Sequence, residues 1–412
     1  MNIWLINHYA VPPKYYPLAR QTYFAKHLMV MGHTVTIIAA STVHNSDKNL
    51  ITDGVRWREE IVDGVHYVYI KCLDYQGNGL RRIYNMCEFA WKLPGVCKRF
   101  PRPDAIVATS MPPTSCAVGI HLARKYKCRG VAEIADLWPE SIVAMGIAGP
   151  HHPAVIALRW LEKWIYKKAD ALVFTMEGAY DYIEERKWEK DVPRSKVHYI
   201  NNGVDLESFH YNLEHYQWED PDLDDPDTFK LVYTGSIRQA NGLAQLVACA
   251  EILRDEPKIK FLAYGSGEEL DELRERCQKE GLTNLVFKGP VEKKYIPSIL
   301  TRCNVTLLNY TPDSVKVYRF GNSQNKLFEY LAAGKPVLTN VKLAYNPADR
   351  CHCCYTVISP EGKDYAEAVL MLYHLPKEKS DTVCCAARKT AEEYDFKKLT
   401  EKLLDVIAGK TP

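Results

Sequence analysis

The chain of 412 residues contains no long apolar run. None of its hydrophobic stretches approaches the roughly 18 to 20 residues that cross a bilayer, which excludes an integral membrane protein. Its first residues also lack the basic segment, the apolar run and the small-residue cleavage site of a signal peptide. Low-complexity tracts and short repeats are equally absent, and we expect a cytoplasmic protein.

Paired-cysteine patterns are scarce, although the chain has 13 cysteines. An odd number without an export signal fits reduced thiols better than a disulfide framework. Cys351 and Cys354 have CxxC spacing with His352 between them, but no second CxxC or HxxxH follows, although Cys384 and Cys385 could approach. Two interpretations stay open: a metal or redox site, or half-buried structural thiols.

Length and composition favour two globular domains. A chain of 412 residues exceeds what one core normally supports, and 47% hydrophobic with 25% charged residues is typical of soluble globular proteins. The net charge of +2 is uneven: residues 1–200 hold 26 Lys and Arg against 19 Asp and Glu, and residues 201–412 hold 27 against 32. We expect the first half to face an anionic surface or a phosphate-bearing acceptor, and we predict no nucleic-acid partner.

Two parts of the chain open with the pattern of a doubly wound α/β domain. Residues 2–7 indicate a buried strand, 8–19 a loop, 20–32 an amphipathic helix and 33–41 the next strand. The order strand, glycine-containing loop and helix returns from residue 229 onward. We predict two Rossmann-like domains, joined by an acidic, Pro-containing linker. Their expected boundaries are residues 1–205, a linker at 206–228, and residues 229–390.

Residues 318–340 are the most informative stretch. Gly321, Asn322 and Ser323 supply turn and N-cap chemistry for a predicted helix. Gly334 stands where a left-handed residue ends such a helix, before a buried strand. The sequence therefore predicts a loop, a helix start, an amphipathic helix and a strand in succession.

The first turn of this helix carries Lys326, shortly after Arg319. A cation at the positive end of a helix destabilises it by about a few tenths of a kcal/mol or more unless an anion lies there, which predicts a bound phosphate. Glu329, one turn deeper, could accept hydrogen bonds from ribose hydroxyls in a nucleotide diphosphate site. An ordinary surface helix, in which Lys326 pairs with Glu329, is an equal alternative.

A second phosphate-binding loop is predicted at residues 235–238. Gly235 follows a strand and precedes a helix, so free backbone N–H groups would face an anion there. Arg238 is the nearby cation. Together with Lys326 it would balance the negative charge of a bound diphosphate.

Polar residues follow two strands of the first domain, where doubly wound sheets bind ligands. His8 and Tyr9 follow the first strand, and His8 is either an acceptor-site group or a structural histidine packed among tyrosines. Asp136, Glu140 and Ser141 follow a later strand, where carboxylates could accept hydrogen bonds from hydroxyl groups. Asp136 and Ser141 could also cap the next helix.

Residues 81–102 combine positive charge with aromatic rings, around a single acid, Glu88. Such a segment suits the surface of an anionic bilayer, where basic side chains reach the headgroups and aromatic rings lie among them. A core helix with a solvated basic edge is the alternative. The residues predicted to make this peripheral contact, on the inner face of a membrane, are Arg81, Arg82, Trp91, Lys98 and Arg99.

The sequence NKLFEYLAAGKP at residues 325–336 resembles the C-terminal donor-site motif of family 4 glycosyltransferases, in the subgroup where it reads SPNKLFEYLAAGKP. DLWPES at 136–141 and NNGVD at 201–205 are similar to further segments of that group, so the resemblance covers nearly the whole chain. It implies the GT-B fold, in which two doubly wound Rossmann-like domains face each other across a cleft. In that fold the final helix, here 391–409, crosses back onto the first domain.

The resemblance assigns roles to single positions. Of two family glutamates separated by seven residues, Glu329 matches the second, which binds ribose, and Gly321 stands in place of the first, which lies by the donor sugar. Ser236 and Asn241 replace an arginine and a lysine of the wider family, as in the subgroup, so Arg238 takes the phosphate role. The donor-binding residues implied, with Pro290 and Val291 at the base, are Gly235, Ser236, Arg238, Pro290, Val291, Arg319, Gly321, Asn322, Ser323, Lys326, Leu327 and Glu329.

The function implied is a retaining, metal-independent glycosyltransferase of surface polysaccharide biosynthesis, such as that of O-antigen or capsule. We predict a UDP-linked N-acetylated hexose or deoxyhexose as donor and a lipid-linked or free glycan as acceptor. The residues assigned to catalysis are Arg238, Lys326, Asp136 and Glu140. Two alternatives remain: a nucleotide-sugar epimerase of the same fold, and a non-catalytic partner subunit of a transferase.

Overall fold

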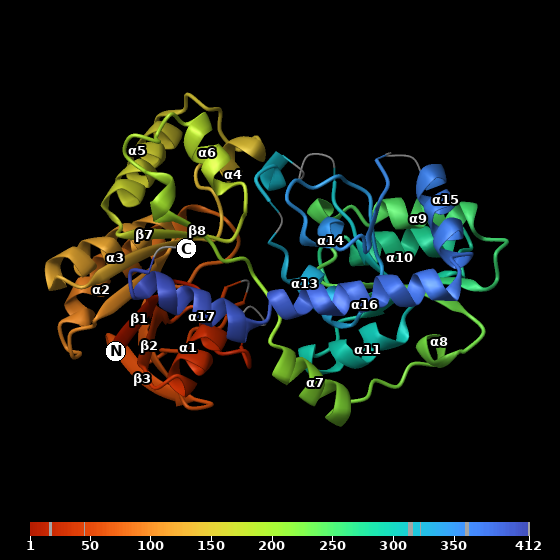
Figure 1. The fold of residues 1–412 in the computed structure, drawn as a ribbon, viewed down its shortest axis with the longest axis horizontal. Coiled ribbons are helices and arrows are strands. Elements are labelled where there is room, and N and C mark those ends of the chain that lie inside the picture. The colour runs from red at the N-terminus through yellow and green to blue at the C-terminus, as the bar shows by residue number, and fades with distance from the viewer. Residues whose placement is uncertain (16–18, 45, 312–315, 322, 359–361, 411–412) are drawn as a thin grey trace. The chain divides into compact units, whose positions relative to one another are not determined.

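The computed structural model describes all residues except 16–18, 45, 312–315, 322, 359–361 and 411–412. The chain divides into two units: unit 1 is Met1–Asn201 with Phe396–Pro412, and unit 2 is Asn202–Asp395. Each unit is built on one central, mainly parallel sheet with helices packed on it (Figure 1). The α/β class with two doubly wound units is confirmed.

The sheet of unit 1 has the strand order β3-β4-β2-β1-β5-β6-β7-β8, and only β3 runs antiparallel to its neighbour. The chain winds from β1 toward β2 on one side and from β5 toward β8 on the other, so the winding reverses beside β1. Ligands of such sheets bind beyond the carboxyl ends of the strands at this reversal. The strands are β1 Asn2–Ile6, β2 Thr34–Ala40, β3 Trp57–Val62, β4 Val65–Ile70, β5 Ala105–Thr109, β6 Arg129–Ile134, β7 Ala171–Phe174 and β8 Val197–Tyr199.

Two helix layers cover this sheet (Figure 1). On one face, α1 (Arg20–Val30) packs against α17 (Phe396–Ile407). On the other, α3 (Pro113–Tyr126) packs between α2 (Leu80–Cys97) and α5 (Pro153–Lys168). Right-handed crossovers impose this division, because α1 connects strands in the opposite direction to α2, α3 and α5. Shorter elements are α4 Glu140–Ala144, α6 Ala179–Glu185 and the 3-10 turn η1 Arg194–Lys196.

Asp63 and Gly64 connect a β-hairpin, in which β3 and β4 pair antiparallel up to Val62 and Val65. Asp63 has φ 49° and Gly64 has φ 80°. Two central residues with positive φ define a type I′ turn, for which Asp-Gly is a favoured pair. The hairpin adds β3 as an antiparallel edge strand to an otherwise parallel sheet.

A buried ion pair ties α1 to the interior of unit 1. The Arg20 guanidinium lies 2.8 Å from the Glu133 carboxylate on β6, and both side chains are almost fully buried. Arg20 also donates to the carbonyl oxygens of Ile200 and Asn201, while Glu133 accepts from the Thr109 hydroxyl at 2.7 Å. Because every charged group here has partners, the pair can stay buried and fix the segment that leaves unit 1.

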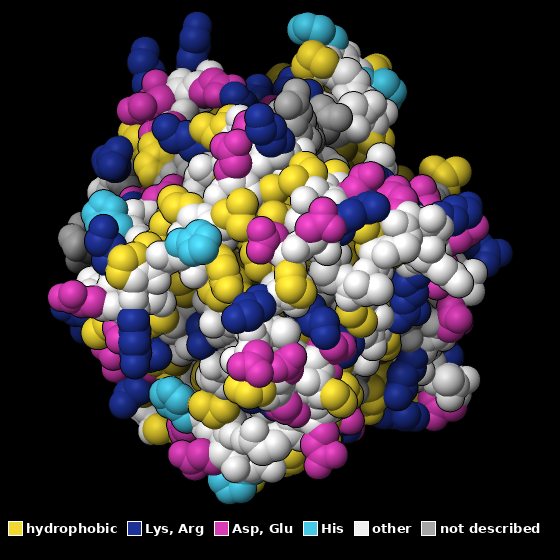
Figure 2. Space-filling model, turned by 90° about the vertical axis from the view of Figure 1, so that its right-hand side faces the viewer, with side chains coloured by type: hydrophobic (Ala, Val, Ile, Leu, Met, Phe, Trp, Pro, Cys, Tyr) yellow, Lys and Arg dark blue, Asp and Glu magenta, His cyan; other side chains and the backbone are white. Residues whose placement is uncertain are grey.

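The sheet of unit 2 is wholly parallel, in the order β11-β10-β9-β12-β13-β14. Its strands are β9 Phe229–Thr234, β10 Ile259–Tyr264, β11 Leu285–Gly289, β12 Val305–Leu308, β13 Val337–Thr339 and β14 Cys354–Thr356. Its α-helices are α7 Leu206–His215, α8 Pro221–Asp224, α9 Ala244–Ile252, α10 Leu270–Lys279, α11 Ile296–Arg302, α13 Asn325–Ala332, α14 Pro347–Arg350, α15 Gly362–Tyr373 and α16 Lys377–Glu393. Short 3-10 turns are η2 Gln239–Asn241, η3 Lys293–Tyr295 and η4 Lys316–Tyr318. Seen from the side of α10 and α15, acidic and basic side chains are interspersed over the surface (Figure 2).

Two expected boundaries differ from the structure. Residues 206–228, expected as a linker, carry α7 and α8 and belong to unit 2, where α7 packs against α11 and η3. The acidic run is neutralised locally, because Lys288 lies 2.6 Å from both Asp220 and Asp222. The final helix, expected at 391–409, consists instead of the end of α16 and the whole of α17, which begins at Phe396 and packs on α1 in unit 1.

Candidate functional site

Helix α13 begins at Asn325, and its N-cap directly follows residues 321–323, which were predicted to supply the turn and the N-cap. Its N-cap is Gln324, whose side chain makes no capping hydrogen bond and instead donates to the Tyr318 hydroxyl at 2.6 Å. Ser323, the predicted N-cap, accepts a hydrogen bond from Asn202 Nδ2 at its backbone oxygen (2.7 Å). Asn322 lies outside the described residues. The backbone N–H groups of the first turn are therefore left without a side-chain cap and can face an anion.

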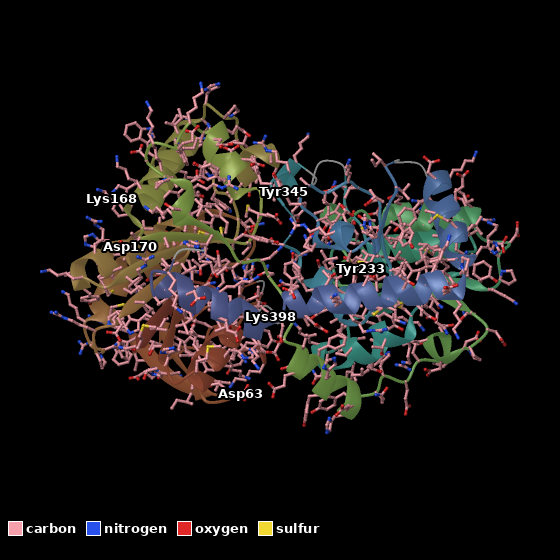
Figure 3. All side chains as sticks on the ribbon, viewed as in Figure 1. Asp63, Lys168, Asp170, Tyr233, Tyr345 and Lys398 are labelled. Carbon is pink, nitrogen blue, oxygen red and sulfur yellow. The ribbon has the colours of Figure 1, made fainter. Side chains whose placement is uncertain are left out.

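Lys326, in the first turn of α13, reaches back to β9. Its Nζ donates to the Tyr233 hydroxyl at 2.9 Å and lies 4.3 Å from the centre of that ring. Tyr233 is fully buried inside unit 2 (Figure 3), and its own hydroxyl donates to the Ser236 carbonyl oxygen at 2.6 Å. Among the described residues, no carboxylate lies within ion-pair distance of Nζ, and burial lowers the pKa of Lys326 to about 7. A bound anion would restore the charged form.

The loops after β9 and β10 pack backbone against backbone. A Cβ atom on Gly265 would lie 1.7 Å from the Gly235 oxygen, and one on Gly267 would lie 2.0 Å from the Ile237 oxygen. Ile237 N also donates to the Ser266 oxygen at 2.9 Å. The two glycines of the GSG sequence are thus required for this close approach, which holds the loop at 235–238 in place.

The two positions at which this chain departs from the wider family pattern contact each other. Asn241 is buried, and its Nδ2 donates to the Ser236 carbonyl oxygen at 2.8 Å and to the Ser236 hydroxyl at 3.1 Å. Arg238, between them, is exposed and has no ion pair within the described part of the chain. Serine and asparagine therefore brace the loop, and Arg238 remains as its available cation.

Glu329, one turn along α13, does not pair with Lys326. Its carboxylate lies 3.3 Å from Nζ of Lys293 in η3, so the expected pairing of an ordinary surface helix is wrong. Lys293 follows Pro290 and Val291, the segment assigned to the nucleotide base. The structure thus brings together the loop at 235–238, the start of α13 and the segment after β11, at the carboxyl ends of strands in one sheet.

The remaining donor-site predictions fall in different surroundings. Leu327 is fully buried, so its side chain belongs to the core of unit 2. Arg319 is exposed, and its guanidinium lies 4.4 Å from the centre of the Phe320 ring. Gly321 has φ 137°, and Gly334 ends α13 with φ 67°, as predicted for a left-handed residue. Tyr233 and Lys293 were not predicted from the sequence. Tyr233 could have been found from its position two residues before the loop glycine, Gly235.

Among the acceptor-side predictions, Glu140 is not a free carboxylate. It is the first residue of α4 and forms ion pairs with Arg186 and, at 2.7 Å, with Arg159. Both guanidinium groups contact the same oxygen, Oε1, and hold α4 against α5 and α6. The role predicted for Glu140 toward an acceptor hydroxyl stays a prediction.

Asp136 and Ser141 do not cap α4, whose N-cap is Pro139, so the capping prediction is wrong. Ser141 is buried, and its hydroxyl donates to the Leu137 oxygen at 2.9 Å. Asp136 is exposed in the loop that follows β6, and desolvation by the surrounding protein raises the pKa of its carboxyl. Of the three, only Asp136 is exposed; Glu140 is half-buried and ion-paired.

His8 follows β1 but is fully buried, which fits the structural interpretation rather than an acceptor-site group. Its Nε2 lies 2.6 Å from Asn85 Oδ1, and its ring packs edge-on against Tyr9 and Phe89. Burial lowers the pKa of His8 to about 3, so the ring is neutral near pH 7. Tyr9 accepts hydrogen bonds from Arg82 at 3.1 and 3.0 Å, which fixes the start of α2 to the loop after β1.

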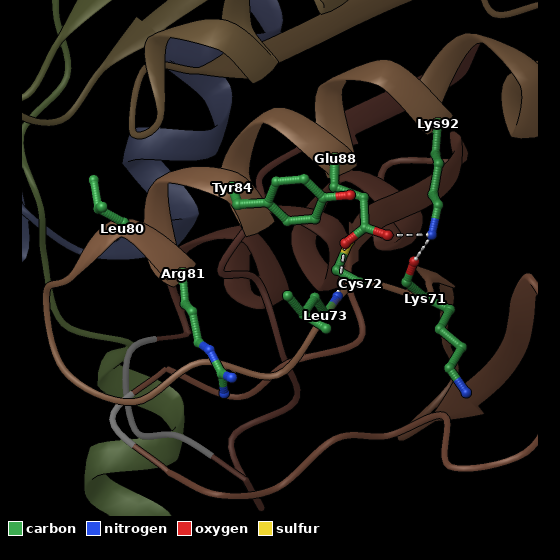
Figure 4. A pocket seen from close by; sticks show the side chains of 8 residues that line it. All are labelled: Lys71, Cys72, Leu73, Leu80, Arg81, Tyr84, Glu88 and Lys92. Atoms are coloured by element: carbon green, nitrogen blue, oxygen red, sulfur yellow. Dashed lines mark hydrogen bonds and ion pairs between the residues drawn. The ribbon is translucent and has the colours of Figure 1, made fainter.

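The basic and aromatic segment forms α2 and borders a pocket of about 550 Å³ (Figure 4). Glu88, the single acid, lies 2.7 Å from Lys92 and accepts a hydrogen bond from Leu73 N at 2.7 Å. Trp91 is 80% exposed, whereas Arg82 is held by Tyr9 and Asn78 and does not belong to the free basic surface. Arg81, Lys98 and Arg99 are exposed, and the pocket lining consists of Lys71, Cys72, Leu73, Leu80, Arg81, Tyr84, Glu88 and Lys92.

The cysteine cluster near residue 352 fits structural thiols. Cys353 is fully buried, and the sulfurs of Cys351 and Cys353 both donate to the Ala348 oxygen, at 3.3 and 3.4 Å. Within the part of the chain that the structure describes, no group of three or more His, Cys, Asp or Glu side chains is placed to hold a metal ion. The same part includes no helix whose length and apolar character would let it span a membrane.

Comparison with known proteins gives matches in both units. A model of the glycosyl transferase 4-like domain matches residues 19–203, and a model of the glycosyl transferases group 1 matches residues 228–374. A protein of Escherichia coli K12, named colanic acid biosynthesis glycosyl transferase WcaI, is 26% identical over 294 residues, which are 66% of this chain and 68% of that protein.

Solved structures match over nearly the full length. Sucrose-phosphate synthase of Thermosynechococcus elongatus matches with a TM-score of 0.72 at 16% identity, over 99% of this chain and 98% of that one. HepE of Anabaena, solved with UDP and glucose, matches with a TM-score of 0.65 at 14% identity, over 98% and 99% of the two chains. At such identities the likeness concerns the fold.

The protein has two doubly wound units, and in the second unit an uncapped helix start lies beside the loop at 235–238. Together with the matched domains, these features define the class: this is a glycosyltransferase of the GT-B fold. Its first unit carries a glycosyl transferase 4-like domain, matched over residues 19–203, and its second unit carries a glycosyl transferases group 1 domain, matched over residues 228–374. The family resemblance of the motifs at residues 136–141 and 325–336 is therefore confirmed.

Proposed function

We propose that this glycosyltransferase moves an N-acetylated hexose or deoxyhexose from a UDP-linked donor to a lipid-diphosphate-linked glycan, in the biosynthesis of a surface polysaccharide. The single observation that carries the donor half is the position of Lys326. Its ammonium lies beside the loop at 235–238, at an uncapped helix start, with a lowered pKa and no carboxylate partner in the described residues. A bound diphosphate would pair with this ammonium and accept hydrogen bonds from the N–H groups of the helix start.

The relatives support a UDP-linked donor and a role in polysaccharide biosynthesis. HepE was solved with UDP and glucose, and WcaI is named for the biosynthesis of colanic acid. In the proposed complex, Glu329 accepts hydrogen bonds from the ribose hydroxyls, and the backbone at Pro290 and Val291 contacts the base. The Glu329 carboxylate, which lies 3.3 Å from the Lys293 ammonium, has two oxygens that can accept from two hydroxyls.

The chemical step develops negative charge on the leaving diphosphate as the glycosidic bond to the donor breaks. Lys326 and Arg238 stabilise that charge together with the N–H groups at the start of α13, so the proposed reaction needs no divalent metal. Asp136 is the carboxylate proposed to position an acceptor hydroxyl, since Glu140 is already bound by two arginines. Retention of the anomeric configuration is proposed from the family.

The acceptor half of the proposal rests on α2. Its exposed Trp91 and Arg81, together with the exposed Lys98 and Arg99 directly after its end, suit a peripheral contact with an anionic membrane, where a lipid-linked glycan resides. Glu88 is neutralised by Lys92, so it opposes this contact little. The protein would then work at the inner face of the membrane.

A panel of nucleotide sugars, screened by thermal unfolding and then by transfer, tests the function. A donor at about 100 times its dissociation constant should raise the free energy of unfolding by about 2.7 kcal/mol. Lys326→Met should lose this gain, while Lys279→Met, at an exposed lysine of α10, should keep it. Donor conversion without any acceptor would indicate an epimerase, and the absence of stabilisation by every nucleotide sugar would overturn the proposal.

A further inference from the structure

Helix α5 exposes a line of large apolar side chains, outside the segment proposed to contact a membrane. Ile156, Trp160 and Trp164 are 43%, 78% and 36% exposed. Their spacing of four residues places them along one side of the helix. In the preceding loop, Met145 is 64% and Ile147 is 72% exposed. An apolar surface of this extent indicates an interaction site.

The helices α2, α3 and α5 share one layer, because α3 packs against both of the others on the same face of the sheet (Figure 1). The exposed sides of α2 and α5 therefore both face away from the sheet. Trp91 on α2 and Trp160 on α5 are each about four-fifths exposed, at 80% and 78%. Between them, α3 exposes His121, Arg124 and Lys125. A single outer face thus carries a tryptophan on either side of a basic helix.

This three-helix layer presents no free carboxylate, and all three helices are described over their whole length. Their two acids are Glu88, which Lys92 neutralises, and Glu162, which is buried and accepts from the hydroxyls of Tyr166 and Tyr182 at 2.8 Å each. The cations of the three helices are Arg81, Arg82, Lys92, Arg124, Lys125, Arg159, Lys163, Lys167 and Lys168.

Some of these cations have partners outside the layer, and some do not. Asp191 pairs with Lys163 and Lys167, at 3.1 and 2.7 Å. Arg81, Lys125 and, at the end of α5 (Figure 3), Lys168 have no ion pair within the described residues. The free charge on this face is therefore positive. The face of unit 2 in Figure 2 differs, because acidic and basic side chains alternate over it.

We propose that the outer face of the α2–α3–α5 layer lies on an anionic phospholipid bilayer, anchored by Trp160 on α5 as well as by Trp91 on α2. Indole rings prefer the interface between headgroups and acyl chains, and unpaired cations are attracted to anionic headgroups. Charge complementarity favours an anionic surface as the occupant, and the exposed indole rings on either side of the basic helix favour the headgroup region of a bilayer. The inference rests on the proposed membrane contact of α2, and it adds a second anchor that fixes the orientation of unit 1 on the surface.

Vesicle binding by the full chain tests the second anchor. We would compare Trp160→Ala, Trp91→Ala, the double variant and Ile252→Ala, the last a control at a half-exposed residue of α9 in unit 2. On vesicles of phosphatidylglycerol and phosphatidylcholine, each tryptophan variant should bind roughly tenfold more weakly, and the double variant weaker still. The control should bind like the parent. Brominated lipids should quench less of the tryptophan fluorescence in each tryptophan variant.

The outcomes separate this inference from the proposals on which it rests. Unchanged binding and quenching for Trp160→Ala, beside weaker binding for Trp91→Ala, would overturn the second anchor and leave the α2 contact standing. If the parent protein does not bind these vesicles, both proposed membrane contacts are overturned. The proposed transferase activity is tested separately, by transfer to a soluble acceptor. A lower sedimentation mass for Trp160→Ala with unchanged vesicle binding would assign this face to a protein interface and overturn the inference. Equal thermal unfolding of all variants excludes misfolding.

Discussion

The ammonium nitrogen of Lys326 lies 2.9 Å from the hydroxyl oxygen of Tyr233, on a strand 93 residues earlier in the chain. The hydroxyl proton of Tyr233 points to the Ser236 carbonyl oxygen at 2.6 Å, so its oxygen accepts from the lysine. Tyr233 is therefore a positioning residue: it fixes the lysine to the glycine loop without offering a negative charge. The ammonium thus has no negatively charged partner among the described residues, and a bound anion would supply one.

Tyr233→Phe should weaken donor binding by removing this anchor while keeping the ring. We expect the affinity for UDP to fall roughly three- to tenfold, which corresponds to the net contribution of one ordinary hydrogen bond. Calorimetric titration measures it. Tyr365→Phe is the control, because Tyr365 is buried in unit 2 and donates to Asn309 instead. Equal affinities for the parent and Tyr233→Phe would show that the lysine does not depend on this hydroxyl.

The low pKa of Lys326, about 7, predicts that donor binding depends on pH. Below pH 7 the lysine is charged before the donor arrives. Above it, binding must take up a proton, and the affinity should fall up to about tenfold per pH unit. Titrations with a UDP-sugar at pH 6 to 9, in buffers of different ionisation enthalpy, measure both the affinity and the proton uptake. Lys326→Met should remove the dependence.

The same pKa has a consequence for the protein without ligand. The folded-state pKa lies below the unfolded value of about 10.4, so the unfolded chain binds more protons between these two pH values. The charged lysine therefore lowers stability below pH 7, and this loss disappears as the pH rises. Lys326→Met should accordingly stabilise the free protein more at pH 6 than at pH 10, as measured by urea unfolding. A pH-independent difference would contradict the burial of this charge.

Glu329→Gln should weaken nucleotide binding and leave the fold intact. The amide keeps one acceptor but loses the charge that strengthens bonds from ribose hydroxyls, so a loss of roughly tenfold is expected. Direct titration with UDP measures the affinity of the variant. Glu275→Gln, on an exposed ion pair of α10, is the matched control and should bind normally. A folded Glu329→Gln variant with full affinity would remove Glu329 from the site.

Sugar transfer should persist in excess chelator, since Lys326 and Arg238 are proposed to balance the leaving diphosphate. The rate measured with EDTA should match the rate with added magnesium within about twofold. Arg238→Gln should lower transfer in both conditions alike, because the guanidinium is exposed beside the loop and has no ion pair in the described residues. If activity is lost in chelator and restored by manganese or magnesium, the metal-independent mechanism is contradicted.

Attachment through α2 should be sensitive to salt. Replacing Arg81, Lys98 and Arg99 with glutamine removes three free cations, each worth about 1 kcal/mol near an anionic leaflet, so binding to anionic vesicles should nearly vanish at low salt. Flotation at low and high salt measures it, and transfer to a short soluble acceptor should stay nearly unchanged. Arg82→Gln is the contrast: its guanidinium is bound by Tyr9 and Asn78, so it should lower stability more than membrane binding.

Much of the fold was predictable from local signals. The first strands and helix, the loop after β9 and Gly334 were identified because each depends on the conformation of a few consecutive residues. Boundaries were less certain where packing decides them. The acidic segment at 206–228 had the composition of a linker, yet lysines of unit 2 neutralise Asp220 and Asp222 and hold it in that unit.

By itself the sequence determined the order of strands, loops and helices, the loop at 235–238 that begins with Gly235, and the presence of a lysine and a glutamate one turn apart on α13. Only the tertiary structure decided which charges are free. Glu140 is engaged by Arg159 and Arg186, Glu329 by Lys293, and Lys326 by no carboxylate in the described residues. The physical reason is that ion pairing and desolvation depend on distances between residues far apart in the chain, which a local pattern does not contain.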